Sequence, residues 1–148
     1  MTYFYSYAII PELKLIVCNF QGESTIDHIR QVNMQFFADP RSDSMTNLLL
    51  DFRHAVSIAY KFELFQYIDF LKKNTQIKEK VRVGFLIRTP NQKFLVTIYK
   101  PLARLLGMDV EYFETLEPCL TWMEIATDDH KEVDSTLTSI KDKTIIYY

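Results

Sequence analysis

Two short apolar runs, separated by one amphipathic stretch, limit the folds open to this chain more than any other feature. The first run covers residues 47–52 (NLLLDF) and the second covers residues 81–87 (VRVGFLI). Continuous apolar runs of this length are typical of strands that are covered on both faces. Between the runs, apolar residues recur at every third position and predict a helix with a core face of Phe62, Phe65, Ile68 and Leu71. This order predicts two parallel, neighbouring strands joined by a helical crossover.

The remaining elements complete an alternation of strands and helices. Aromatic residues alternate along residues 3–8, and a second β-prone stretch closes at Gly22, so we expect an antiparallel hairpin that turns near Pro11. Ser24 has the form of a cap for a helix that ends near Ala38. Further elements follow as a helix over residues 89–105, a strand over residues 110–113 and a helix that opens at residue 117. We therefore predict an α/β fold with a mixed sheet of about five strands and about four helices, in which an N-terminal antiparallel hairpin precedes a mostly parallel remainder.

Length and composition are those of one globular domain. The chain has 148 residues, of which 48% are hydrophobic and 24% are charged. We assign residues 1–127 to a single α/β domain and residues 128–148 to a charged C-terminal extension. The extension ends in the β-prone segment 145–148, which we expect to pair with another strand because a bare apolar strand promotes aggregation.

Charge and motif content exclude several function classes. Seventeen basic residues stand against 19 acidic ones, and a net charge of −2 creates no field that would hold nucleic acid. The three histidines are scattered and the three glycines form no phosphate loop, so we predict no metal and no cofactor. Cys18 and Cys119 lack CxxC spacing and are expected to be buried free thiols. Without a secretory signal or a transmembrane segment, we expect a cytoplasmic protein.

The element order, taken with three segments, resembles the STAS family of SpoIIAA-like anti-sigma-factor antagonists. The segments are residues 17–25, residues 48–53 (LLLDFR) and residues 117–123 (EPCLTWM), and the resemblance covers residues 3–126. It implies a STAS-like regulatory domain that binds partner proteins, and in some members nucleotides or lipids, without catalysing a reaction. In the anti-sigma-factor antagonists, a serine at the start of the helix after the third strand is phosphorylated, and Ser57 has the comparable place here. The alternative is that Ser57 is a plain helix cap.

Four polar residues form the best candidate crevice. Asp51, Arg53, His54 and Ser57 lie at the carboxyl end of the predicted central strand, and open α/β sheets bind ligands at the carboxyl ends of their strands. Arg53 can hold an anion in a bidentate fork and His54 can titrate near neutrality. The alternative is that Asp51 and Arg53 simply pair with each other. A Ser-His-Asp triad is disfavoured because the three residues lie within seven positions and no nucleophile elbow is present, so we predict no enzyme and no catalytic residue.

Aromatic residues on the predicted helix after the central strand supply a second candidate site. Tyr60, Tyr67 and Phe70 extend the apolar arc beyond the width that one sheet face needs, and the surplus is a candidate surface for a protein partner or self-association. Simple aromatic packing is the alternative. The sequence therefore predicts a non-enzymatic regulatory or protein-binding module, phospho-regulated at Ser57. The alternative function is a carrier of a small apolar or anionic ligand, or a lipid, in an apolar pocket between helices and sheet.

Overall fold

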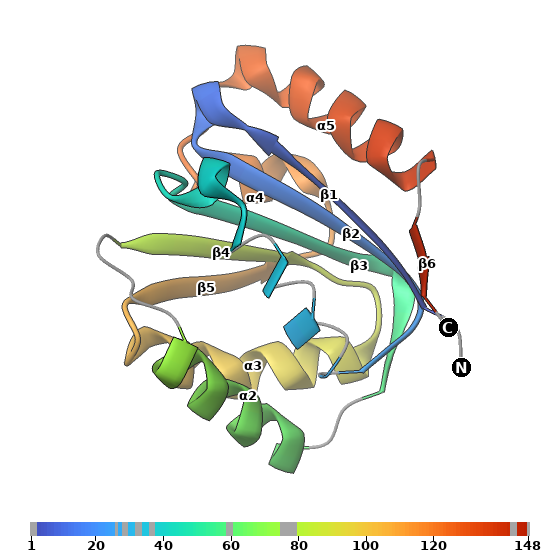
Figure 1. Ribbon diagram of the computed structural model, residues 1–148. Helices are drawn as coiled ribbons and strands as arrows, with labels where there is room; N and C mark the ends of the chain where they lie inside the picture. Colours follow the sequence, from blue (N-terminus) through green and yellow to red (C-terminus); the bar gives the residue numbers. More distant parts are fainter. Residues whose placement is uncertain are drawn as a thin grey trace.

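The computed structural model describes residues 3–25, 27, 30–31, 34–35, 38–58, 61–74, 80–142 and 145–147. Within this part of the chain, six strands form one sheet: β1 (Tyr3–Ile10), β2 (Leu15–Thr25), β3 (Asn47–Ile58), β4 (Val81–Leu86), β5 (Met108–Phe113) and β6 (Ile145–Tyr147). The helices with defined bounds are α2 (Lys61–Asn74), α3 (Pro90–Arg104), α4 (Leu116–Trp122) and α5 (Thr127–Asp142), and two short 3-10 turns are η1 (Pro11–Leu13) and η2 (Pro40–Ser42). Figure 1 shows the whole arrangement.

The strand order is β5-β4-β3-β2-β1-β6, which places β3 and β2 in the middle of the sheet. β3 and β4 are parallel neighbours, with Leu48 opposite Val83 and Leu50 opposite Phe85. The predicted parallel pairing of the runs at residues 47 and 81 is therefore confirmed. β2 pairs in parallel with β3, and β5 pairs in parallel with β4. α2 and α3 return the chain to the starting edge of the sheet after β3 and β4.

The N-terminal hairpin is also confirmed. β1 and β2 are antiparallel, with Tyr5 opposite Phe20 and Ile9 opposite Ile16, and η1 forms their turn at Pro11. Lys14 closes the turn in the left-handed conformation, with a φ of 50°. β2 continues three residues past the predicted end at Gly22, because its last residues pair with β3.

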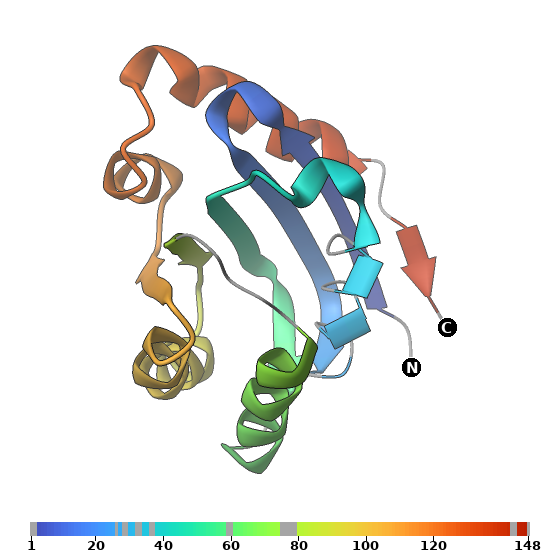
Figure 2. The ribbon, with the colours of Figure 1, turned by 60° about the vertical axis from the view of Figure 1, so that its left-hand side comes forward.

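Helices cover both faces of the sheet (Figures 1 and 2). Period-two alternation along β2 sends Ile16, Cys18 and Phe20 toward the core under α2 and α3, whereas Leu15 and Val17 face the core under α4 and α5. The first core contains buried aliphatic and aromatic side chains, whereas the buried side chains of the second are aliphatic or sulfur-containing. The continuous apolar pattern of the inner strands follows from this double cover.

The predicted core face of α2 is wrong in part. Its buried residues are Leu64, Tyr67, Ile68 and Leu71, whereas Phe65 is 45% exposed and the side chain of Phe62 lies outside the described residues. An α-helix advances about 100° per residue, so a strict three-residue repeat drifts around the helix by about 60° at every step. The spacing i, i+3, i+4, i+7 stays on one face, and α2 buries that set.

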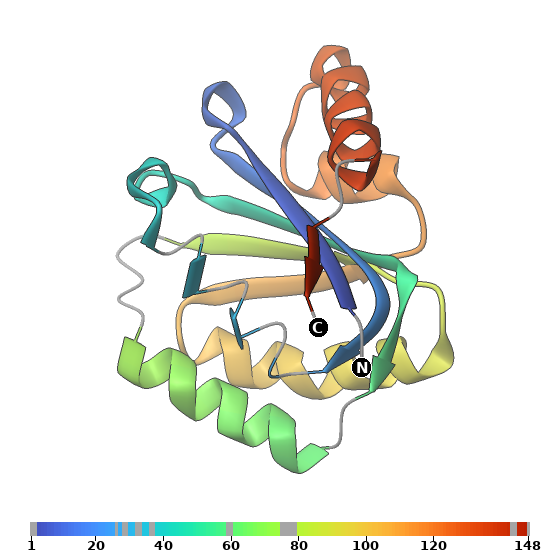
Figure 3. The same ribbon diagram turned by 45° about the vertical axis from the view of Figure 1, so that its right-hand side comes forward.

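In the C-terminal segment, α5 packs against the sheet and β6 joins it; the sequence did not predict the helix. Four residues of α5 are buried at helical spacing: His130, Val133, Leu137 and Ile140. The last three belong to the core under α4 and α5. The chain then forms β6, which pairs antiparallel with residues 3–5 of β1, so the expected pairing of this segment is confirmed (Figure 3).

The helix predicted from Ser24 to Ala38 lies partly outside the described residues. Ser24 itself belongs to β2, so its assignment as a helix cap is wrong. The described positions between the strand and Asp39 are helical, namely Asp27, Arg30, Gln31, Met34, Gln35 and Ala38.

Candidate functional site

The candidate crevice on β3 has a different backbone from the one expected. β3 runs to Ile58, beyond the predicted end at Phe52, whereas β4 pairs with it only as far as Asp51. The β2–β3 register shifts from Asn19–Asp51 to Gln21–His54, so β3 carries one extra residue in a β-bulge. Bulges of this kind bend a strand and redirect its side chains.

Ser57 therefore lies within a strand and not at the start of a helix. Its backbone is opposite Ser24 of β2, and α2 begins four residues later at Lys61. The assignment of Ser57 as a helix cap is wrong, and the stabilisation that a helix dipole would give a phosphate at this position does not apply. Its side chain lies outside the described residues, so its role as a phosphorylation or binding site stays a prediction.

Gln92 holds β3 in place beyond the end of β4. Its side-chain Nε2 donates to the carbonyl oxygens of Phe52 at 2.9 Å and Ala55 at 3.0 Å. Its Oε1 accepts from the backbone N–H groups of Arg88 at 2.8 Å and Thr89 at 3.2 Å, as part of the capping box that begins α3. Gln92 is 3% exposed, so it replaces the missing β4 ladder with buried hydrogen bonds. The Thr-x-x-Gln pattern was visible in the sequence as a capping box, but its second role was not.

Asp51 and Arg53 pair with each other across the bulge. Arg53 Nε donates to Asp51 Oδ1 and Nη2 donates to Oδ2, both at 3.0 Å, and the Arg53 backbone N–H also reaches Oδ1 at 3.0 Å. Asp51 is buried and Arg53 is half-buried, and the hydrogen bonds to Asp51 raise the pKa of the Arg53 guanidinium. The alternative stated for these two residues, mutual pairing, is the observed arrangement, and it engages the fork that an anion would need.

His54, Cys119 and Asn19 are the other described polar groups of this region. His54 is exposed, and its Nε2 lies 3.4 Å from Lys141 Nζ of α5. Cys119 is fully buried, and burial raises its pKa to about 12, so the thiol is protonated at neutral pH. Asn19, which is opposite Asp51 in the register, is 1% exposed, and its Nδ2 has no hydrogen-bond partner among the described residues.

One residue of the surplus aromatic arc, Tyr67, is buried in the core. Tyr67 is 7% exposed, and its ring centroid lies 6.1 Å from that of Tyr99 and 6.3 Å from that of Phe70. Burial raises the pKa of the Tyr67 hydroxyl well above its ordinary value. Phe70 is half-buried, and Tyr60 lies outside the described residues. For Tyr67 the structure shows the simple aromatic packing that was the alternative, since its ring contacts Tyr99 of α3.

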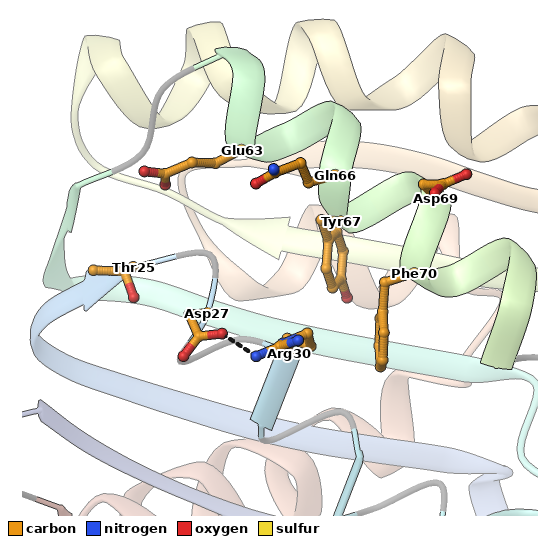
Figure 4. A pocket seen from close by; sticks show the side chains of 8 residues that line it. All are labelled: Thr25, Asp27, Arg30, Glu63, Gln66, Tyr67, Asp69 and Phe70. Carbon is orange, nitrogen blue, oxygen red and sulfur yellow. Dashed lines mark hydrogen bonds and ion pairs between the residues drawn. The ribbon is translucent and has the colours of Figure 1, made fainter.

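A cavity of about 590 Å³ opens beside the same two rings (Figure 4). We call it the α2 cavity, because α2 forms one wall and the residues after β2 form the other. Its lining consists of Thr25, Asp27, Arg30, Glu63, Gln66, Tyr67, Asp69 and Phe70. The Tyr67 and Phe70 rings point from α2 toward Arg30, whose guanidinium lies 5.7 Å from the Phe70 ring centroid. Both aromatic residues were candidates in the sequence, whereas the polar lining residues were not. No regular sequence spacing connects Thr25, Asp27 and Arg30 with α2.

The protein has an N-terminal hairpin, helical crossovers between parallel strands and helices on both faces of the sheet. These features define an α/β protein with a SpoIIAA-like fold, as the sequence predicted. The chain is similar in structure to an uncharacterized protein of the DUF3478 family, with a SpoIIAA-like fold, from Shewanella loihica PV-4. The TM-score is 0.56 and the sequence identity 12%, over 82% of this chain and 94% of that chain. No protein-family model and no curated protein matches the sequence.

Two further properties of the described residues bear on the kind of site. No group of three or more His, Cys, Asp or Glu side chains among them is arranged to hold a metal ion. Within the same part of the chain, no helix is long and apolar enough to cross a membrane.

Proposed function

We propose that this chain is a non-enzymatic binding module that takes a small molecule in the α2 cavity. The observation that carries the proposal is the cavity itself, whose volume of about 590 Å³ lies within the roughly 300–1,000 Å³ typical of small-molecule sites. Two aromatic side chains, Tyr67 and Phe70, supply apolar surface, and several polar side chains surround them. An apolar surface with a few polar groups is the usual composition of a ligand site.

The α2 cavity is favoured over the crevice on β3 because of how each uses its polar groups. Asp51 and Arg53 satisfy each other through three hydrogen bonds, so a ligand there would have to break an existing pair. In the α2 cavity, Phe70 keeps half-buried aromatic surface that a ligand can cover. Covering that surface contributes to binding without disrupting the fold.

The test is NMR titration of the ¹⁵N-labelled protein with small phenyl compounds carrying an amine, an alcohol or a carboxylate. We expect at least one of them to shift resonances of α2 together with those of Thr25, Asp27 and Arg30. Phe70→Ser should weaken binding, whereas the matched variant Phe94→Ser, on an exposed ring of α3, should leave it unchanged. If none of the probes shifts these resonances at millimolar concentration, the proposal is wrong.

A second candidate function, binding of a partner protein, is favoured by exposed apolar residues on α3. Phe94 is 58% exposed and Leu105, just past the end of α3, is 78% exposed. The two positions are 11 residues apart, which is close to three full helical turns, so they lie on the same side of α3. Single exposed apolar residues are common, and a pair on one side is a small candidate docking surface.

This candidate retains the regulatory role that the sequence resemblance implies, with Ser57 as its predicted phosphorylation site. Sedimentation velocity and pull-down from native lysate should change when Phe94 and Leu105 are both replaced by serine. Unchanged profiles would remove the candidate. Phosphopeptide mass spectrometry of the protein from its native source checks Ser57 independently.

A further inference from the structure

The α2 cavity has a charge pattern that narrows its ligand class. Its described lining contains three carboxylates, Asp27, Glu63 and Asp69, and one cation, Arg30. Two of the four charges form an ion pair, because the Arg30 guanidinium bonds to the Asp27 carboxylate. The lining therefore carries an excess of negative charge.

Arg30 is occupied on two sides. It bonds to Asp27, and its guanidinium lies over the Phe70 ring (Figure 4). Asp27 accepts a further hydrogen bond from Gln31 Nε2 at 3.2 Å. An anionic ligand would have to draw Arg30 away from both a carboxylate and an aromatic face, so this arrangement disfavours anions.

Glu63 is the carboxylate that remains. It is half-buried in the first turn of α2, and it has no hydrogen bond or ion pair with the described residues. Asp69, in contrast, is paired with Lys73 at 3.1 Å on the exposed side of α2. Glu63 lines the cavity one helical turn before Tyr67, and an unpaired carboxylate there attracts a cation because partial burial reduces the screening by water.

Resting on the proposed function, we propose that the ligand of the α2 cavity is a small organic cation. Its ammonium or guanidinium group pairs with Glu63, and its apolar or aromatic body covers Phe70 and the accessible edge of Tyr67. The class differs from the small apolar or anionic ligand that the sequence analysis gave as an alternative. The anionic form of that ligand relied on Arg53, which the structure pairs with Asp51.

Three probes have nearly the same shape but differ in charge, so together they measure the effect of ligand charge on binding. The probes are 2-phenylethylamine, 2-phenylethanol and phenylacetate. By NMR titration, we expect the amine to bind about tenfold more tightly than the alcohol, because a charge-assisted hydrogen bond to a half-buried carboxylate exceeds an exposed ion pair. The carboxylate should bind most weakly. Raising the salt concentration should weaken binding of the amine and leave binding of the alcohol unchanged.

Glu63→Gln should remove the preference for the amine while the alcohol still binds. Glu117→Gln is the matched control, because it removes the same charge from the first turn of another helix, α4, away from the cavity. Wild-type selectivity and its salt dependence provide the test even if Glu63→Gln fails to fold.

The outcomes distinguish this inference from the proposed function. If all three probes bind equally, or if the amine preference survives in Glu63→Gln, the inference fails while the proposed function stands. If none of the three binds, the proposed function fails and the inference fails with it.

Discussion

Replacing Gln92 by alanine removes the side chain that holds β3 beyond the end of β4. In the wild-type protein this amide makes four hydrogen bonds, two to carbonyl oxygens of β3 and two from backbone N–H groups at the start of α3. Phe52 is 3% exposed and Ala55 is 0% exposed, so water cannot readily replace the lost donor at their carbonyl groups. The N–H groups of Arg88 and Thr89 belong to an exposed and a half-buried residue, and water can reach them more easily.

The magnitude follows from the two buried carbonyl groups. Leaving a buried hydrogen-bonding group without a partner costs about 1–3 kcal/mol, so two such groups give an expected loss of about 2–6 kcal/mol in the free energy of unfolding. The lower part of this range applies if β3 relaxes and admits water. Since small domains are stable by only about 5–15 kcal/mol, the loss is a large fraction of the total.

Urea unfolding followed by far-ultraviolet circular dichroism measures the change, with the m-value as a check on two-state behaviour. Gln66→Ala is the control, because Gln66 is exposed on α2, and it should change stability by less than about 0.5 kcal/mol. Gln92→Glu keeps two acceptor oxygens for α3 but turns a carboxylate toward the two carbonyl groups of β3, so it should be at least as destabilising as alanine. A Gln92→Glu variant of wild-type stability, or a loss below about 0.5 kcal/mol in Gln92→Ala, would refute the reasoning.

Three further predictions concern packing, thiol chemistry and pH. Gly84→Ala should lower the free energy of unfolding by about 1–3 kcal/mol, because the new Cβ would lie 2.5 Å from Cys119 Sγ. In urea unfolding, adding Cys119→Ala should recover part of this loss. Strict additivity of the two free-energy changes would contradict the contact. Burial raises the pKa of both Cys119 and Cys18. Neither thiol should therefore react with an aromatic disulfide reagent at pH 8 in the folded protein, whereas both should react in denaturant. Rapid reaction of the native protein would show that the thiols are accessible. Hydrogen bonds from Arg41 lower the pKa of Asp39 from 3.8 to about 2, so the stabilisation by this pair is complete above pH 3.8 and lost as the pH falls through about 2. An NMR titration should show a pKa of about 2 for Asp39 in the wild type and a value closer to 3.8 in Arg41→Gln. A wild-type Asp39 that titrates at 3.8 would contradict the prediction.

The candidate site could be anticipated only in part. Tyr67 and Phe70 were selected because they exceeded the apolar arc that one helix face needs, and both line the α2 cavity. Glu63 and Arg30 were not selected, because surface charges have no periodicity that marks a site. Mutual pairing of Asp51 and Arg53, at i and i+2, was one of two interpretations of the sequence, but the sequence does not reveal the bulge that follows Asp51 in β3.

The local sequence pattern was enough to predict the strands that contain a continuous apolar run or a regular alternation of apolar residues. Residues 47–52 and 81–87 led to parallel neighbouring strands, and residues 3–20 led to the hairpin, because period-two and continuous apolar patterns follow from strand geometry. The other features of the structure depend on contacts between segments that are distant in the sequence. β3 extends past Phe52 because β2 pairs with it and Gln92, 40 residues away, donates to its carbonyl oxygen. α5 is held by four buried residues in a segment whose composition is mostly polar. The α2 cavity forms where Thr25, Asp27 and Arg30 meet α2. Interactions of this kind depend on distances in space, which spacing along the chain does not encode.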